Sequence, residues 1–398
     1  MKRKLNEICA RYTVPQEVKA KGIYPYYKPI SSGQDPVVTM ADGHKVLMFG
    51  SNSYLGLSDD PRLKEAAIAA VKKYGTSCSG SRFLNGTLDI HQELEEKLAK
   101  FVGKEEAVTY STGFQVNLGV VSCLGFKGGY ILLDDTDHAC IIDGSRLGWS
   151  TVYKFKHNDM EALEKKLKVC EPDAYKLIVI DGVYSMLGDL AKLPEICDLC
   201  DKYGASVMID DAHGLGVFGE NGSGTASHFG LTDRTDLIMG TFSKSFGSLG
   251  GFIAGDHDVL NFIKHNSRSL IFSASMTPAA TAAASKALDI MIEEPERREH
   301  LWDTTRYAWK CFRENGFDIN LTESPIIPLM VRDTIKALSL VEEAYRQGVF
   351  ITPVIAPAVP EKDVLIRFAL MATHNREHVD QAVEVLTKIF KEYGIIEG

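Results

Sequence analysis

Polar residues of the types used in catalysis follow several strand-like runs of this sequence. Four such groups stand directly after apolar runs: Ser111–Phe114, Asp181 with Ser185, Asp210–His213, and Ser243–Lys244. In open α/β sheets, ligands bind beyond the carboxyl ends of the strands, so these side chains are expected to converge on one crevice. Each group alone is a weak signal, and their convergence is what indicates a site.

These residue types suit an enzyme that uses pyridoxal phosphate (PLP). Such a site needs a lysine that forms an imine with the cofactor, and burial favours its neutral, nucleophilic amine. It needs a carboxylate beside the ring nitrogen, because the protonated ring is the electron sink for a carbanion. It also needs donors at a helix N-terminus for the phosphate. Lys244, Asp210 and the Ser111–Phe114 turn supply these groups, and His213 could reach the ring oxygen.

The elements around these residues predict an α/β fold with a mostly parallel sheet. Helix-like segments alternate with short apolar runs, a pattern typical of parallel strands with helices on both faces. The strand-like runs are AVTY, YILLD, TVYKF, KLIVID, SVMID, LIMGTF and GFIAG, and the helix-like segments cover residues 61–73, 88–102, 115–124, 159–168 and 194–203.

Three regions are expected along the chain. They are an N-terminal segment (1–55), a large cofactor-binding domain (56–280) and a smaller C-terminal α/β domain (281–398). The N-terminal segment should hold a helix at 3–20 and a hairpin, because Asp42-Gly43 separates two alternating stretches. The C-terminal region should begin with two long helices and continue with strand-like and helical segments: 280–294, 297–314, ESPIIPLMV, 334–347, LIRFALM and 376–393.

Composition excludes several classes of protein. The chain has 398 residues and a formal net charge of -9, which argues against a nucleic-acid partner. No apolar run approaches the length of a membrane span, and the N-terminus lacks the apolar core of a secretory signal. Eight scattered cysteines indicate reduced thiols, so we expect a cytoplasmic protein.

Three local patterns suggest other chemistry, and each lacks the context that it requires. Gly214–Gly219 matches the dinucleotide fingerprint G-x-G-x-x-G, but it runs into the loop-like ENGSGT and does not open a helix. Cys197 and Cys200 have a metal-like spacing, but no second pair completes a tetrahedral site. Asp210 and Asp211 lack the accompanying ligands of a metal site. We therefore expect a loop, two helix cysteines and no metal.

Several longer motifs are together highly specific. They are Asn52–Leu57, Gly80–Arg82, Gly86-Thr87 with His91, Ser111–Phe114, Asp137–Ala139, Asp210–His213 and Gly240–Lys244. Over nearly its whole length the chain resembles the α-oxoamine synthases. The resemblance implies PLP fold type I, similar to aspartate aminotransferase, with a seven-stranded sheet in the large domain. It also implies that an amino acid is condensed with an acyl-CoA and that carbon dioxide is released.

The resemblance implies a role for each matching residue at the cofactor. Lys244 would form the imine and remove the substrate α-proton. Asp210 would pair with the ring nitrogen and His213 with the ring oxygen. His138 would stack on the ring and touch the substrate carboxylate. Hydrogen bonds to the phosphate or near the ring would come from Thr112, Gly113, Phe114, Ser185, Thr241 and Ser243.

Further residues are implied at the substrate and at a second subunit. Arg367, whose apolar surroundings argue against a solvated ion pair, would clamp the substrate carboxylate. Asn52 would also contact the substrate. The resemblance implies a homodimer with a shared active site, in which Ser273 or Ser275 reaches the neighbour's phosphate.

Two motifs indicate the substrates. Phe242–Ser245 and Phe272–Pro278 look most like the bacterial members of the family that use L-serine and a long-chain acyl-CoA, such as palmitoyl-CoA. Relatives that use glycine or alanine more often carry a glycine where this chain has Ser243. The implied products are 3-ketosphinganine, CoA and carbon dioxide, at the first step of sphingolipid synthesis.

Three alternatives remain open at this point. The chain could act on glycine or alanine with a shorter acyl-CoA, as glycine C-acetyltransferase or 8-amino-7-oxononanoate synthase does. It could belong to another fold-type I class, such as the aminotransferases or the sulfur-eliminating lyases. It could also be a non-catalytic binding protein with this fold, although Lys244, Asp210 and His138 are all intact.

The N-terminal segment 4–21 has two interpretations. Pro15 and the mixed charges of the segment favour an arm packed across the dimer. A weak interfacial helix is the alternative, and any membrane contact would then be peripheral, at the inner membrane.

Overall fold

The computed structural model describes residues 3–397 and divides them into two compact units. The larger unit runs from Asn52 to Trp302. The other comprises the described residues up to Ser51 together with those from Asp303 onward. The domain boundaries expected at 55/56 and 280/281 concern parts of the chain that would fold independently, and they remain a prediction. Residues 1, 2 and 398 lie outside the described residues. The first two belong to the expected N-terminal segment (1–55), where no secretory signal is expected, and the last belongs to the expected C-terminal domain (281–398).

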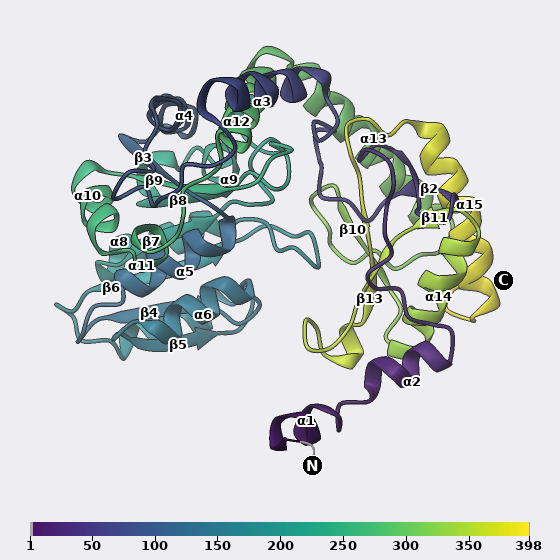
Figure 1. Cartoon of the computed structure of the whole chain (residues 1–398). Helices are drawn as coiled ribbons and strands as arrows, with labels where there is room; N and C mark the ends of the chain where they lie inside the picture. Colours follow the sequence, from purple (N-terminus) through teal and green to yellow (C-terminus); the bar gives the residue numbers. More distant parts are fainter. Residues whose placement is uncertain (1–2, 398) are drawn as a thin grey trace. The chain divides into compact units, whose positions relative to one another are not determined.

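The larger unit is built on a seven-stranded sheet (Figure 1). Its order is β3-β9-β8-β7-β6-β4-β5. Strand β9 is antiparallel to both of its neighbours, and the other pairs are parallel. All seven strand-like runs are therefore strands of one mostly parallel sheet, as predicted. The strands are β3 (Glu106–Tyr110), β4 (Tyr130–Asp134), β5 (Thr151–Phe155), β6 (Lys176–Asp181), β7 (Ser206–Asp210), β8 (Leu237–Thr241) and β9 (Gly251–Gly255).

Helices cover both faces of this sheet. Successive side chains of a strand point to opposite faces of the sheet, and both faces of β6 are apolar: Ile178 and Ile180 join one apolar core, whereas Leu177 and Val179 join the other. The first core lies under α3 (Pro61–Tyr74), α4 (Asp89–Val102), α7 (Met160–Lys168), α8 (Leu193–Tyr203) and α12 (Pro278–Glu293). The second lies under α5 (Gly113–Cys123), α6 (Ala139–Leu147), α10 (His257–Asn266) and α11 (Arg268–Ile271).

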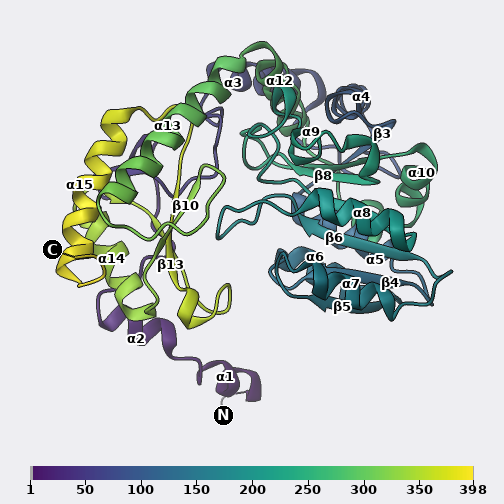
Figure 2. The ribbon, with the colours of Figure 1, turned by 180° about the vertical axis from the view of Figure 1, so that it is seen from behind.

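The smaller unit contains two three-stranded sheets and long helices (Figure 2). The predicted hairpin is present, with Gly43 in a left-handed conformation at φ 85° between antiparallel β1 and β2. The sheets have the orders β1-β2-β11 and β10-β13-β12. The strands are β1 (Val37–Thr39), β2 (Lys45–Met48), β10 (Ile326–Met330), β11 (Val349–Phe350), β12 (Thr352–Val354) and β13 (Leu365–Ala369), and the helices are α14 (Thr334–Arg346) and α15 (Arg376–Glu392). Helix α13 (Pro295–Glu314) crosses from one unit into the other.

The N-terminal helix differs from its prediction. The expected single helix at 3–20 is two short ones, α1 (Lys4–Cys9) and α2 (Val14–Ala20). Pro15 has no backbone N–H, so it is tolerated in the first turn of a helix and not in its interior. It stands in the first turn of α2. Neither helix has a buried residue.

The glycine-rich and cysteine patterns that suggested other chemistry form ordinary structural elements. Gly214–Gly219 forms turns and leads into a short 3₁₀ helix, η1 (Glu220–Gly222), so it does not open an α-helix. Cys197 and Cys200 are buried, free thiols of α8, as predicted. Further 3₁₀ or single-turn segments are α9 (Thr225–His228), η2 (Thr232–Arg234) and η3 (Glu361–Asp363). Among residues 3–397, no helix is both long and apolar enough to cross a membrane.

Candidate active site

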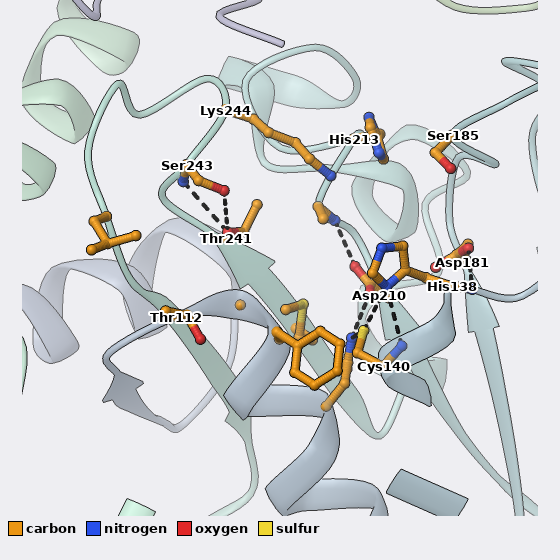
Figure 3. Close-up of a pocket in the computed structure, with 16 residues that line it drawn as sticks. Thr112, His138, Cys140, Asp181, Ser185, Asp210, His213, Thr241, Ser243 and Lys244 are labelled. Carbon is orange, nitrogen blue, oxygen red and sulfur yellow. Dashed lines mark hydrogen bonds between the residues drawn. The ribbon is translucent and has the colours of Figure 1, made fainter. Parts of the chain in front are cut away.

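A pocket of about 240 Å³ opens at the carboxyl ends of the central strands of the larger unit (Figure 3). It is lined by residues that follow β3, β4, β6, β7 and β8, so the predicted convergence occurs. Ten of the predicted site residues line it: Thr112, Gly113, Phe114, His138, Ser185, Asp210, His213, Thr241, Ser243 and Lys244.

Asp210 is the buried carboxylate of the pocket. It is the last residue of β7 and is only 5% exposed. Oδ1 accepts a 3.0 Å hydrogen bond from the backbone N–H of Ala212. Oδ2 accepts a 2.5 Å bond from the side-chain amide of Asn117, a fully buried residue of α5. Both oxygens of this carboxyl group thus accept a hydrogen bond, and these bonds fix its orientation in the pocket.

Lys244 and His213 lie on neighbouring loops of the pocket (Figure 3). Lys244 is half-buried, three residues beyond the end of β8. His213 lies in the turn after β7, where its Nδ1 is 2.6 Å from the hydroxyl of Tyr54. This bond and the edge-to-face contact of the two rings fix the orientation of His213. Tyr54 is buried, so the motif Asn52–Leu57 contributes to the site through His213.

His138 begins helix α6 and is its N-cap residue. Its backbone N–H donates to Oδ2 of Asp181, and its Nδ1 accepts from the N–H of Cys140. Burial lowers the pKa of the His138 imidazole, Asp210 raises it, and the Lys244 charge lowers it. The neutral ring is thus favoured even though the side chain is exposed in the single subunit.

A second acidic group lies behind His138. Asp181, the last residue of β6, is 5% exposed, and its backbone N–H donates to Oδ1 of Asp137. Burial raises the pKa of both carboxyls well above the usual value, with further upward shifts from Asp210 at Asp181 and from Asp181 at Asp137. The Lys244 charge acts in the opposite direction on Asp181.

The other end of the pocket is rich in hydrogen-bond donors. Thr112 caps helix α5 by accepting from the backbone N–H of Gln115. The first amides of an α-helix have no intrahelical acceptor, so Gly113 and Phe114 offer their N–H groups to an anion. The hydroxyls of Thr241 and Ser243, 2.9 Å apart, belong to the same region. This arrangement suits a phosphate.

The residues present fit PLP. A Cβ at position 113 would lie 2.7 Å from Oγ1 of Thr241, so glycine is required where the start of α5 meets the end of β8. That close approach gathers backbone and hydroxyl donors at one end of the pocket, while Asp210 lies at the other and the Lys244 amine points toward it (Figure 3). A phosphate site, a buried carboxylate and a lysine are the three groups that the cofactor requires.

Four predicted residues lie outside the lining of this pocket. Ser275 donates to the carbonyl of Gly86 within its own chain. Ser273 accepts from the amide of Gln115, on the helix whose start lines the pocket. Asn52 lies near the pocket: its side-chain oxygen is 3.5 Å from the hydroxyl of Tyr54, which in turn bonds to His213 of the lining.

Arg367 is the fourth of these residues and belongs to the smaller unit. It lies in β13, paired with Pro328 on one side and Thr352 on the other, and is only 7% exposed. Burial rules out the interpretation of Arg367 as a solvated surface ion pair. Its role at the substrate remains a prediction.

Asn117 and Cys140 were missed by the sequence reasoning. Asn117 is four residues after Gly113 in the otherwise apolar stretch VNLGVV, so it lies on the same helix face as the pocket. A fully buried amide in such a helix is a usable signal, because buried polar groups are normally hydrogen-bonded. Cys140 gave no comparable signal, because free cysteines are common in apolar cores.

Comparisons with known proteins agree with this site. A sequence model of the family "Aminotransferase class I and II" matches residues 44–386. Serine palmitoyltransferase of Sphingobacterium spiritivorum is 57% identical over 391 residues, which cover 98% of each chain. An 8-amino-7-oxononanoate synthase of Symbiobacterium thermophilum is 41% identical over 95% of this chain and 97% of its own.

A solved structure confirms the predicted fold class. Serine palmitoyltransferase from S. paucimobilis, described with a bound PLP–myriocin aldimine, superposes with a TM-score of 0.95. The two chains are 32% identical, and the match covers 99% of this chain and 100% of the other. The aspartate aminotransferase-like fold follows from this match and from the seven-stranded sheet. The chain belongs to the class I and II aminotransferase family, in the α-oxoamine synthase branch that includes the serine palmitoyltransferases.

Proposed function

We propose that this protein is a PLP-dependent acyltransferase that condenses L-serine with a long-chain acyl-CoA, such as palmitoyl-CoA. The products would be 3-ketosphinganine, CoA and carbon dioxide. The observation that carries the proposal is the convergence of Lys244, Asp210, His213 and His138 with phosphate-binding donors in one pocket. The choice of serine and a long acyl chain rests on the 57% identity to a serine palmitoyltransferase.

Each pocket residue has a task in holding the cofactor. Lys244 would bind it covalently, and Asp210 would keep its ring nitrogen protonated. His213, oriented by Tyr54, would donate to the ring oxygen. When bound, PLP supplies an electron sink that stabilises negative charge at the substrate α-carbon. The phosphate would be held by Thr112, Gly113, Phe114, Thr241 and Ser243, with Ser185 near the ring.

Other residues would handle the substrate. The Lys244 amine, which is free once serine has taken its place, would take the α-proton of serine, and the α-carbon would then form a bond to the thioester carbon as the C–S bond to CoA breaks. Arg367 would clamp the serine carboxylate until it leaves as carbon dioxide, and a proton would then return to the α-carbon. His138 and Asn52 would help to orient the same substrate.

We also propose a homodimer in which Ser273 reaches the phosphate of the neighbouring subunit. Phe272, directly before Ser273, is 75% exposed in the single chain, which is unusual for a large apolar side chain. Helices α1 and α2, which bury no residue in this chain, would form an arm on the second subunit. The eight free cysteines suit a cytoplasmic location.

A substrate screen tests the reaction. The purified protein is incubated with serine, glycine or alanine and with acetyl-CoA or palmitoyl-CoA, and CoA release and product mass are measured. We expect serine with palmitoyl-CoA to give the highest kcat/KM and a product of the mass of 3-ketosphinganine. Efficient turnover of glycine or alanine with a short acyl-CoA, and not of serine, would assign the chain to another branch of the family.

A further inference from the structure

Four pocket residues form a continuous hydrogen-bonded chain (Figure 3). The amide nitrogen of Asn117 lies 2.5 Å from Oδ2 of Asp210 and 3.1 Å from Sγ of Cys140. Sγ of Cys140 in turn lies 2.8 Å from Nδ1 of His138. The backbone N–H of Cys140 also points to Nδ1, over 3.3 Å. Asn117, Cys140 and Asp210 are all buried, so water does not compete for the bonds among these three residues.

The protons of this chain can be assigned by counting donors. Asp210 accepts from Ala212 as well as from Asn117, so the Asn117 side chain must turn its NH₂ group and not its oxygen toward the carboxylate. An NH₂ group has two protons, and the second points to Sγ of Cys140. The oxygen of Asn117 has no hydrogen-bond partner among the described residues, so the thiol proton does not go there.

The Cys140 thiol therefore donates to His138. Burial raises the pKa of this thiol, with a smaller upward shift from Asp210, so Sγ keeps its proton at neutral pH. Its sulfur accepts from Asn117, and its S–H is directed at Nδ1 of His138. Nδ1 thus faces two donors, the S–H and the backbone N–H of Cys140, and it must be the unprotonated nitrogen of the ring.

We propose that Cys140 is a positioning residue that holds His138 as the neutral Nε2–H tautomer. His138 then presents an N–H donor to the pocket instead of a lone pair. Such a donor suits an anionic group, and its assignment to the serine carboxylate rests on the proposed function. Protonating Nδ1 would displace both donors of Cys140, so the same contacts resist conversion to the cation.

Nitrogen NMR of the ring tests the tautomer directly. Full-length protein is labelled with ring-¹⁵N histidine and measured without cofactor, and the His138 signals are identified by their absence in His138→Gln. We expect an unprotonated Nδ1 and a protonated Nε2 at pH 7.5. Since no substrate or cofactor is involved, this result stands or falls independently of the proposed reaction. A protonated Nδ1 in the wild type would overturn the proposal.

Three variants separate this role from simple packing. Cys140→Ala should give a mixture of tautomers and raise the pH at which His138 takes up a proton by about one unit, a tenfold increase in proton affinity. Cys140→Ser keeps a donor of similar size and should restore the wild-type pattern. Cys200→Ala removes a buried thiol on α8, outside the pocket, and should change neither property.

The variants also define what would contradict the proposal. An unchanged tautomer and proton affinity in Cys140→Ala would show that the thiol only fills space. If that variant does not fold, Cys140→Ser and the wild-type spectrum still decide the matter, because the proposal requires the Nε2–H form in both.

Discussion

The side-chain amide of Asn117 donates a 2.5 Å hydrogen bond to Asp210, although the two residues are 93 positions apart in the sequence. Asn117 lies one turn into α5, whose first residues line the phosphate end of the pocket. Asp210 ends β7. One helix thus offers its N-terminal amides to an anion and, a turn later, holds the carboxylate that faces the ring nitrogen in our account. A shift of α5 would disturb both ends of the cofactor site.

Replacing Asp210 with asparagine tests the electron sink. Asp210→Asn should still bind PLP, because the phosphate donors and Lys244 are untouched, but an amide cannot balance the charge of a protonated ring nitrogen. We expect kcat/KM to fall about 10²- to 10³-fold or more, as for a lost electrostatic partner of roughly 3–4 kcal/mol. Asp173→Asn, at an exposed position, is the matched control. Near-normal turnover of Asp210→Asn would mean that a different carboxylate serves the ring.

Arg367 should govern serine binding and leave the cofactor unaffected. A guanidinium binds a carboxylate through two parallel hydrogen bonds, which a lysine cannot reproduce. In Arg367→Lys we expect serine affinity to fall about ten- to a hundredfold, the effect of roughly 1.5–3 kcal/mol, with the PLP absorbance unchanged.

The measurement is a serine titration followed by the change in PLP absorbance. Arg332→Lys is a suitable control, since Arg332 forms an exposed ion pair with Asp318 in the same unit. If serine bound equally well to wild type and to Arg367→Lys, the carboxylate clamp would have to be sought elsewhere.

His157 should make stability depend on pH. Although burial by itself lowers the pKa of His157, hydrogen bonds to Asp134 and Asp189 raise it to about 10. A raised pKa stabilises the fold fully below the unfolded-state value near 6.5, and this contribution is lost as pH rises toward 10. The advantage of wild type over His157→Gln should therefore shrink by about 1.4 kcal/mol per pH unit between pH 7 and 9.

Urea unfolding at pH 7, 8 and 9 measures this advantage. The exposed His265→Gln provides the control and should show no such trend. A difference between wild type and His157→Gln that stays constant over this range would show that His157 is not held as a cation between its two carboxylates.

Much of this architecture could be predicted because its signals are local. Buried strands such as LIMGT and GFIAG are short apolar runs, and the polar residues that end them could be identified directly. The same runs do not reveal strand direction: β9 is antiparallel to both of its neighbours, yet it is as apolar as the parallel strands of the sheet. Helix α6 was not predicted, since Asp143-Gly144-Ser145 in its middle has the composition of a turn.

The rest of the site depends on contacts that sequence spacing does not encode. Cys140 and Asn117 meet across two helices, and the amide is recognisable as functional only once Asp210 is seen beside it. Tyr54 belongs to a motif that was identified, but its hydrogen bond to His213 spans 159 positions. Such pairs are fixed by packing in three dimensions.

The central claim is that Lys244 carries the cofactor. The direct test is borohydride reduction of the PLP-loaded protein, followed by peptide mapping to locate the lysine that acquires the mass of reduced PLP. We predict that the peptide containing Lys244 is modified, and that Lys244→Ala, though folded, yields no reduced adduct. An adduct on another lysine, or one that persists in Lys244→Ala, would contradict the account.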